Sequence, residues 1–369
     1  MRPETAAIHA ARPTGGPVSP PIVLSTTFEH GPAYEQTSGY AYVREDSPNV
    51  ANLETRLAAM EQGCGAVAFA SGMAAASALF STLPRGSDVL FHNDSYFAYR
   101  RLSEEVLPQW GLSGRFLDFK DEAALETALK KRPSLLCFET PSNPLMDVLD
   151  IAKLSAQAHD AGAKVMIDGS FATPALQQPL DLGADYVMHA LTKYIGGHSD
   201  MQGGVIIARD ETETLERLVL TRTLTGGVLA PFNAWMLSRG LETLFARMAR
   251  HSDNALMVAS ALETNKHIER VRYVFLESHP QIDLARNQMS AGGGMVSIDV
   301  KGGRDDALHV ASRVRLFTNA TSFGGAESLI EHRPSVEGEA TLLPQNSLRL
   351  SIGLEHPDDL IEDLEQALG

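Results

Sequence analysis

Short apolar segments alternate with helical segments through the middle of the chain, and this alternation constrains the fold more than any other feature. The expected strands are 66–70, 88–91, 114–119, 134–139, 164–168, 185–189 and 204–208. Helices are expected between several of them, at 51–62, 73–83, 122–131 and 151–161. Strands that alternate with helices form a mostly parallel sheet with helices on both faces. The sequence therefore predicts an α/β fold with a mostly parallel seven-stranded sheet.

The segments on either side of this alternation have a different character. Residues 1–43 are rich in Pro, Gly, Ser and Thr and carry little periodicity, so we interpret them as an extended N-terminal arm. The expected sheet lies in a domain at 44–240. A long helical stretch and a mixture of strands and helices follow, which predicts a smaller α+β domain at 241–369. A chain of 369 residues is longer than a single hydrophobic core usually supports, so its length also favours two domains.

Composition excludes several classes of partner. A net charge of −15 argues against nucleic acid or an anionic membrane as the main partner. The two cysteines, Cys64 and Cys137, are too few for a disulfide framework or a zinc site, and no metal is expected. The N-terminus lacks an apolar signal core, and no run of 18 apolar residues occurs. We therefore expect a soluble cytoplasmic protein.

Polar residues directly follow several expected strands. Ser71-Gly72-Met73 opens a helix, where free backbone N–H groups and the helix dipole suit a phosphate. Asp168 closes the strand 164–168, and Lys193 follows the strand 185–189 after an apolar run. In such sheets the ligand binds at the carboxyl ends of the strands.

One ligand, pyridoxal 5′-phosphate, accounts for these groups together. Its phosphate suits Ser71, Gly72, Met73 and Thr192. Its aldehyde suits Lys193, because a lysine drawn toward a core loses its proton easily and becomes a nucleophile. Its ring nitrogen suits Asp168, since a carboxylate there keeps the ring cationic and able to accept electrons. Taken alone, Lys193 is better explained as an ordinary lysine at a strand end, and Asp168 also fits the frequent role of a helix N-cap.

The chain also resembles the Cys/Met-metabolism (trans-sulfuration) family of pyridoxal-phosphate enzymes, which have the aspartate-aminotransferase-type fold. The resemblance is to the cystathionine γ-lyases and γ-synthases, and it runs nearly end to end. It covers PPIVLSTTF (20–28), YVRE (42–45), ASGMAA (70–75), ETPSNP (139–144), IDGSFATP (167–174), LTKYIGGHSD (191–200), SFGGAESLI (322–330) and LRLSIG (348–353).

This resemblance implies roles for the residues around the cofactor. Lys193 corresponds to the Schiff-base lysine, Asp168 to the partner of the ring nitrogen, and Tyr96 to the tyrosine that stacks on the ring and helps proton transfer. The other implied contacts are Gly72, Met73 and Thr192 to the phosphate and Asn143 near the ring hydroxyl. Tyr42 and Arg44 look like the pair that reaches the phosphate of a neighbouring subunit, which implies an obligate dimer and usually a dimer of dimers.

Substrate contacts are implied in the same way. Arg349 matches the arginine that pairs with the α-carboxylate of an amino-acid substrate, a role suited to its planar fork. Ser322 lies near the same group. We also expect Arg101 and Thr321 at the substrate, because segments 97–101 and 319–323 are where the reactions of this family would be distinguished. Arg101 is further expected to lower the pKa of Tyr96.

The sequence departs from the family pattern at four places. Ala190 replaces a serine, which removes one phosphate hydrogen bond, and Gly169-Ser170 replaces Asn-Thr. Phe97-Ala98-Tyr99 replaces Gly-Gly-Thr and must reshape the entrance. Thr321 replaces a glutamate that is placed near the distal end of the substrate, which argues against cystathionine itself.

The predicted function is a lyase that eliminates a γ-heteroatom leaving group from an L-amino acid of the cystathionine, homocysteine or methionine type. Lys193 would take the Cα proton, and Tyr96 or Lys193 would protonate the leaving group. The products would be a 2-oxo acid and ammonia. The alternatives are γ-replacement, as in cystathionine γ-synthase or O-acylhomoserine sulfhydrylase, and a cystathionine β-lyase. A catalytically silent binding protein with the same fold is the non-enzyme alternative.

Overall fold

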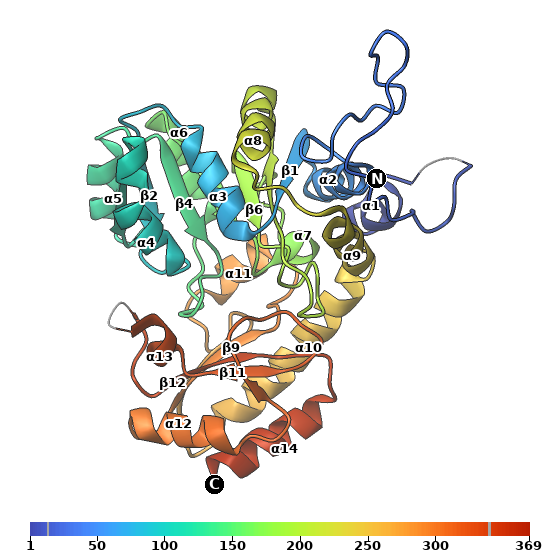
Figure 1. Ribbon diagram of the computed structural model, residues 1–369. Helices are drawn as coiled ribbons and strands as arrows, with labels where there is room; N and C mark the ends of the chain where they lie inside the picture. Colours follow the sequence, from blue (N-terminus) through green and yellow to red (C-terminus); the bar gives the residue numbers. More distant parts are fainter. Residues whose placement is uncertain (13–14, 339–340) are drawn as a thin grey trace.

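The computed structural model describes residues 1–12, 15–338 and 341–369, and two sheets organise it (Figure 1). The larger sheet has seven strands in the order β1-β7-β6-β5-β4-β2-β3. These are β1 Gly65–Phe69, β2 Asp88–His92, β3 Ser113–Leu117, β4 Leu135–Glu139, β5 Lys164–Asp168, β6 Tyr186–His189 and β7 Gly204–Ala208. Only β7 runs antiparallel to its neighbours β1 and β6. The predicted α/β fold with a mostly parallel sheet is confirmed.

Both faces of this sheet are buried, as the apolar strand sequences require. In β4, Leu136 and Phe138 join one core cluster, whereas Leu135 and Cys137 join the cluster on the opposite face. Helices cover the two faces and connect the strands. They are α2 Pro48–Glu61, α3 Gly72–Ser81, α4 Ala98–Glu105, α5 Glu122–Leu129, α6 Ile151–Asp160, α7 Thr173–Leu176 and α8 Thr212–Thr225, with a 3₁₀ turn at Leu107–Trp110.

The second sheet lies below the first in Figure 1 and has the strand order β10-β11-β12-β9-β8. Its strands are β8 Ile268–Arg272, β9 Met295–Val300, β10 Thr318–Asn319, β11 Leu329–Glu331 and β12 Ser347–Ser351. The accompanying helices are α9 Pro231–Leu241, α10 Leu244–Glu263, α11 Ile282–Gln288, α12 Arg304–Arg313, α13 Arg333–Glu337 and α14 Pro357–Leu368. The expected domain boundary at 240–241 falls at the end of α9, and the division into domains remains a prediction.

The N-terminal arm is not extended throughout. Residues Pro3–His9 form the helix α1, whose Ala6 and Ala7 are buried in the main core. Pro3 begins this helix, where its missing N–H costs nothing. The described part of 15–43 runs along the surface and away from the domain (Figure 1). Several large apolar side chains are exposed on it, namely Val18, Ile22, Leu24, Tyr34 and Tyr42.

None of the helices in the described ranges combines the length and the apolar composition that crossing a membrane requires.

Candidate active site

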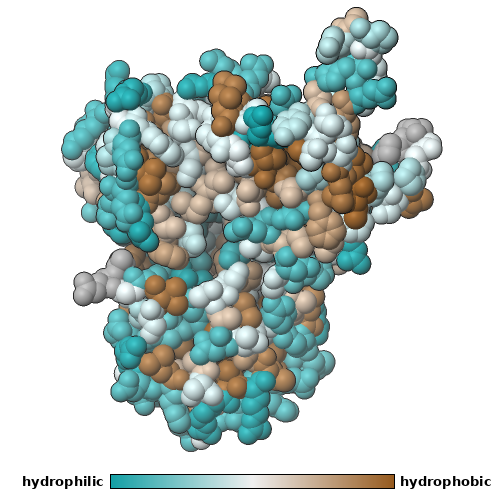
Figure 2. Space-filling model, viewed as in Figure 1, coloured by the Kyte–Doolittle hydropathy of each residue, from teal (hydrophilic) through white to brown (hydrophobic). Residues whose placement is uncertain are grey.

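A cavity of about 390 Å³ lies where the carboxyl ends of β4, β5 and β6 face the smaller sheet. Figure 2 shows the surface hollowed between the parts of the molecule that carry the two sheets. Most of the predicted site residues line this cavity: Ser71, Gly72, Met73, Tyr96, Asn143, Asp168, Thr192, Lys193, Thr321, Ser322 and Arg349. Ligands bind at this edge in α/β sheets because loops from several strands converge there.

Lys193 lies in the turn after β6, with its amine inside the cavity. Its Nζ donates a hydrogen bond to Ser322 Oγ (2.6 Å) and lies 4.8 Å from the centre of the Phe323 ring. Burial, together with the positive charges of Arg349 and Arg333, lowers the pKa of Lys193 to about 8. The neutral, nucleophilic form of the amine is therefore accessible near neutral pH. Its hydrogen-bond partner Ser322 adopts φ 87°, a left-handed conformation that is strained for a residue other than glycine.

Asp168 ends β5 at the base of the cavity, and its side chain is buried. Oδ1 accepts the Ser170 N–H (3.1 Å), and Oδ2 accepts the Tyr99 hydroxyl (3.2 Å). Burial raises the pKa of Asp168, while these hydrogen bonds oppose the shift. A buried carboxylate with this environment can neutralise a cationic ring nitrogen.

The first turn of α3 forms one wall of the cavity. Ser71 is the N-cap and accepts the Ala74 N–H (3.1 Å), so the N–H groups of Gly72 and Met73 are left free of helical partners. Gly204 on β7 permits this turn to lie against the sheet, because a Cβ there would stand 2.3 Å from Ser71 O. With Thr192 opposite, the turn offers the donors and the positive helix end that a phosphate requires.

Arg349 on β12 contributes the planar cation of the site and is buried. Its NH2 donates to Ser322 O (2.8 Å) and pairs with Glu331 (2.5 Å), and its NH1 lies 3.4 Å from Asn143 Oδ1. Burial lowers the pKa of Arg349 to about 10, which leaves it charged at neutral pH. A rigidly held guanidinium of this kind suits a carboxylate.

Arg101 is not brought into the cavity. Its side chain is 73% exposed and pairs with Glu105 on the surface of α4 (3.0 Å). The expectation that Arg101 lowers the pKa of Tyr96 is wrong, because burial raises that pKa and the cations that oppose the shift are Arg333 and Arg349. Four residues apart on one helix, Arg101 and Glu105 meet on its solvent side.

Tyr42 and Arg44 also lie outside the cavity. Tyr42 is 42% exposed, and Arg44 stacks on its ring (5.4 Å) and donates to Thr223 O (3.0 Å). Their expected contact with a neighbouring subunit remains a prediction.

Three lining or neighbouring residues were missed by the sequence reasoning. Arg333 on α13 lines the cavity, stacks on Phe97 (5.4 Å) and pairs with Glu331 (3.3 Å) and Glu337 (2.7 Å). Gln202 adds an amide, and Tyr99 reaches Asp168 from behind the wall. Only Tyr99 carried a signal, as part of a segment that departs from the family pattern.

Comparison with known proteins identifies the family. Residues 4–369 match the family described as Cys/Met metabolism PLP-dependent enzyme. A cystathionine gamma-synthase of Mycobacterium tuberculosis strain H37Rv is 42% identical, covering 100% of this chain and 97% of the relative. An L-methionine gamma-lyase of Pseudomonas deceptionensis is 38% identical, covering 99% and 96%. The crystal structure of metB from Corynebacterium glutamicum superposes with a TM-score of 0.96 at 37% identity, covering 100% of this chain and 98% of the other.

The chain belongs to the Cys/Met metabolism family of PLP-dependent enzymes. Its residues also fit the cofactor that the family name specifies. The free N–H groups at the start of α3 suit the phosphate, Asp168 suits the ring nitrogen, and Lys193 suits the aldehyde. The predicted cofactor and trans-sulfuration family are confirmed.

The lowered pKa of Lys193 predicts how this family member takes up its cofactor. Only the neutral amine attacks an aldehyde, and at pH 7 roughly one amine in ten is neutral when the pKa is about 8. Covalent capture of pyridoxal phosphate by cofactor-free protein is therefore expected to quicken with pH and to level off just above pH 8. Borohydride trapping followed by intact-mass analysis measures this rate. Free Nα-acetyl-lysine, whose rate should rise to about pH 10, is the reference, and the same rise in the protein would contradict the expectation.

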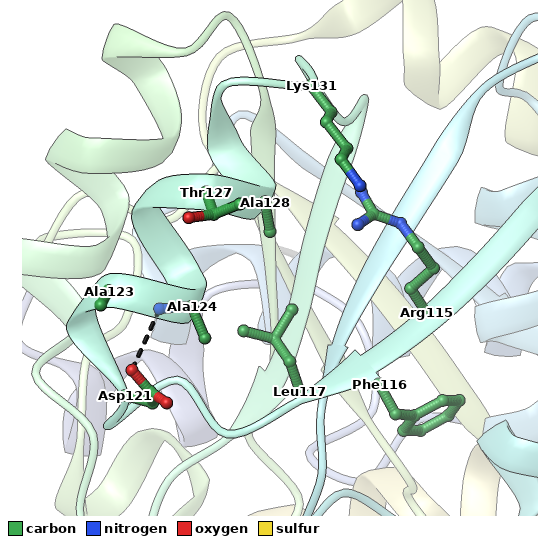
Figure 3. A pocket seen from close by; sticks show the side chains of 9 residues that line it. All are labelled: Arg115, Phe116, Leu117, Asp121, Ala123, Ala124, Thr127, Ala128 and Lys131. Atoms are coloured by element: carbon green, nitrogen blue, oxygen red, sulfur yellow. Dashed lines mark hydrogen bonds between the residues drawn. The ribbon is translucent and has the colours of Figure 1, made fainter.

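A second depression, of about 680 Å³, lies over the edge strand β3 and the helix α5 (Figure 3). Its wall is formed mainly by small and aliphatic side chains, and Asp121 there is occupied as the N-cap of α5. It contains none of the predicted site residues. Across the described ranges, no group of three or more His, Cys, Asp or Glu side chains could hold a metal ion.

Proposed function

We propose that the protein eliminates a γ-heteroatom leaving group, sulfur or oxygen, from an L-amino acid of the cystathionine, homocysteine or methionine type, and releases a 2-oxo acid and ammonia. The observation that carries this proposal is the convergence of Lys193, Tyr96, Asp168 and Arg349 on one cavity. A base, an acid, an electron-sink partner and a carboxylate anchor are the groups that γ-elimination needs.

Arg349, Lys193 and Asp168 have separate roles in the proposed reaction. Arg349 holds the α-carboxylate, and its fixed position beside Ser322 presents the substrate Cα to Lys193. Lys193 Nζ removes the Cα proton, which its lowered pKa favours, and a second proton must leave Cβ before the γ-substituent can depart. The bound pyridoxal phosphate supplies an electron-accepting ring, which Asp168 keeps protonated at nitrogen.

Tyr96 acts on the leaving group. Burial raises the pKa of its phenol, so the hydroxyl stays protonated at neutral pH. It is therefore suited to donate a proton to the departing sulfur or oxygen rather than to act first as a base.

The parts of segments 97–101 and 319–323 that line the cavity are uncharged, which suits an uncharged leaving group. They present Phe97, Thr321 and Phe323 to the cavity. Arg333 stands beside them and pairs with Glu331 and Glu337, while its buried Nη2 makes no hydrogen bond within the described residues. A distal carboxylate buried here would have only this arginine left to pair with among the lining residues that the structure describes, whereas an uncharged leaving group needs no charged partner.

The second candidate is γ-replacement, in which a thiol takes the place of the leaving group. The relative from Mycobacterium tuberculosis is named a cystathionine gamma-synthase, and this likeness over the whole chain favours it. The same lysine, tyrosine and aspartate would serve both reactions, and they would also serve β-elimination from cystathionine. A silent binding protein would need none of them.

The proposal includes a homo-oligomer, with a dimer of dimers as the expected form. Exposed apolar side chains support it, because they gather on the arm (Val18, Ile22, Leu24) and on α8 (Val219, Leu220, Leu224). Figure 2 shows apolar surface beside the base of the arm. Burial of such side chains in an interface is favourable by about 25 cal/mol per Å².

A product assay separates the candidate reactions. Purified holoenzyme is incubated with L-homocysteine, L-methionine, L-cystathionine and O-succinyl-L-homoserine, each with and without added cysteine. We expect 2-oxobutanoate and ammonia from homocysteine or methionine without added thiol. Product formation from the homoserine ester only when cysteine is present would replace the elimination proposal by γ-replacement. Pyruvate from cystathionine would instead indicate β-elimination.

A further inference from the structure

Tyr99 is a buried tyrosine with one polar partner. It lies in the first turn of α4, and 1% of its surface is exposed. Its ring packs against Phe91 (5.7 Å between centres) and edge-on against Phe80 (6.1 Å) and Tyr96 (6.1 Å). Its hydroxyl donates to Asp168 Oδ2 (3.2 Å). The residue thus touches both the acid at the base of the cavity and the tyrosine that lines it.

The carboxylate of Asp168 is held at both oxygens. The Ser170 N–H binds Oδ1 from the following turn, and the Tyr99 hydroxyl binds Oδ2 from a different element. Two donors from different elements, one on each oxygen, restrict the terminal torsion, which is otherwise broad for aspartate. Burial raises the pKa of the Tyr99 phenol well above its ordinary value, so the hydroxyl remains a donor.

The hydrogen bond of the Tyr99 hydroxyl can be removed without changing the packing of the Tyr99 ring. A phenylalanine at 99 would preserve the aromatic contacts with Phe80, Phe91 and Tyr96, and would lose only the donor. A buried hydroxyl pays a desolvation cost unless it is hydrogen-bonded, so the Asp168 contact is what the oxygen contributes. In this chain the donor belongs to the Phe97-Ala98-Tyr99 segment, where the family pattern has Gly-Gly-Thr.

We infer that Tyr99 is a positioning residue for the cofactor: its hydroxyl fixes the Asp168 carboxylate in the orientation that faces the ring nitrogen of bound pyridoxal phosphate. The inference rests on the family's cofactor and is independent of which γ-carbon reaction the enzyme performs. If so, the Tyr99 hydroxyl, although it lies behind the cavity wall, contributes to the part of the cofactor's affinity that depends on the ring nitrogen.

The test compares two ligands that differ only at that nitrogen. Cofactor-free wild type and Tyr99→Phe are titrated by calorimetry with pyridoxal phosphate and with its 1-deaza analogue, in which carbon replaces the ring nitrogen. Tyr99→Phe is expected to weaken pyridoxal phosphate binding by about five-fold, the value of one hydrogen bond, and to leave binding of the analogue unchanged.

Tyr186→Phe is the matched control. Tyr186 on β6 also donates its hydroxyl to a carboxylate, that of Glu211, but it does not line the cavity. This variant should leave the affinity for both ligands as in the wild type.

Two outcomes would overturn the inference. Equal weakening of both ligands by Tyr99→Phe would mean that the hydroxyl only supports the packing of the wall, and no weakening of either would mean that Asp168 needs no such support. A double-mutant cycle provides a second measurement: in an Asp168→Asn background, Tyr99→Phe should produce no additional loss of pyridoxal phosphate affinity. A full additional five-fold loss there would also contradict the role through Asp168. Neither readout requires turnover, so failure of the proposed reaction would not affect it.

Discussion

Replacement of Lys193 by alanine is expected to reduce turnover by roughly 10²- to 10⁴-fold, the range of a lost general acid or base. The variant should also lose covalent attachment of the cofactor, because Lys193 is the only lysine that lines the cavity among the described residues. Its amine is held beside Ser322 and has a pKa of about 8, so it serves as both nucleophile and base, and only an amine forms a borohydride-reducible bond with the cofactor aldehyde. Borohydride reduction followed by intact-mass analysis reports attachment directly, independently of activity.

The control for this variant is Lys153→Ala on the surface of α6. Lys153 is 48% exposed and pairs with Glu122, and such exposed pairs contribute little. The Lys153→Ala protein should retain both turnover and the borohydride-stable mass increase.

Added methylamine is expected to restore part of the turnover of Lys193→Ala, because the free amine can replace the missing proton acceptor. A Lys193→Ala protein that still gains the cofactor mass would contradict the assignment of this residue.

Asp168→Asn is expected to lower pyridoxal phosphate affinity and turnover by roughly 10²- to 4 × 10³-fold. The amide keeps the size of the side chain but cannot carry the charge that pairs with a protonated ring nitrogen, and loss of one partner of a buried ion pair costs about 3–5 kcal/mol. The affinity is measured by calorimetry and the turnover by 2-oxo acid release.

The fold itself should tolerate this change. Burial raises the pKa of Asp168, so its folded-state pKa lies above the unfolded value. Its stabilising contribution is then present at low pH and is lost as the pH rises through the folded pKa, whereas a neutral amide at this position has no charge to bury. The cofactor-free Asp168→Asn protein should therefore unfold at a temperature no lower than the wild type. An Asp168→Asn protein that binds pyridoxal phosphate as tightly as the wild type would contradict the assignment of Asp168 as the partner of the ring nitrogen.

The larger sheet could be predicted from sequence because its strands are buried on both faces. Continuous apolar runs such as 134–139 are recognisable without any tertiary information, and the observed strand Leu135–Glu139 differs by one residue. The carboxyl ends of neighbouring parallel strands meet at one edge of a sheet. Asp168 ends β5 and Lys193 follows β6, so the two had to lie near each other, and both line the cavity.

The errors concern side chains whose direction depends on packing between distant elements. Arg101 and Arg333 illustrate this. The first follows Tyr96 closely in sequence but lies on the solvent side of α4, whereas the second lies on α13 and reaches the cavity from the other sheet. Sequence proximity gave no indication of which cation would lie near the phenol. The helix α1 was missed because a seven-residue segment has too few turns to show a clear period.

The sequence by itself determined the class of fold, the family and the set of groups that meet at the strand ends, because the period of apolar residues and the order of strands are local properties. Only the tertiary structure decided which charges lie close enough to lower the pKa of Lys193, and which hydroxyl holds Asp168. Electrostatic and hydrogen-bond energies depend on separations of a few ångströms between residues far apart in the chain. Those separations arise only when the two sheets close around one cavity.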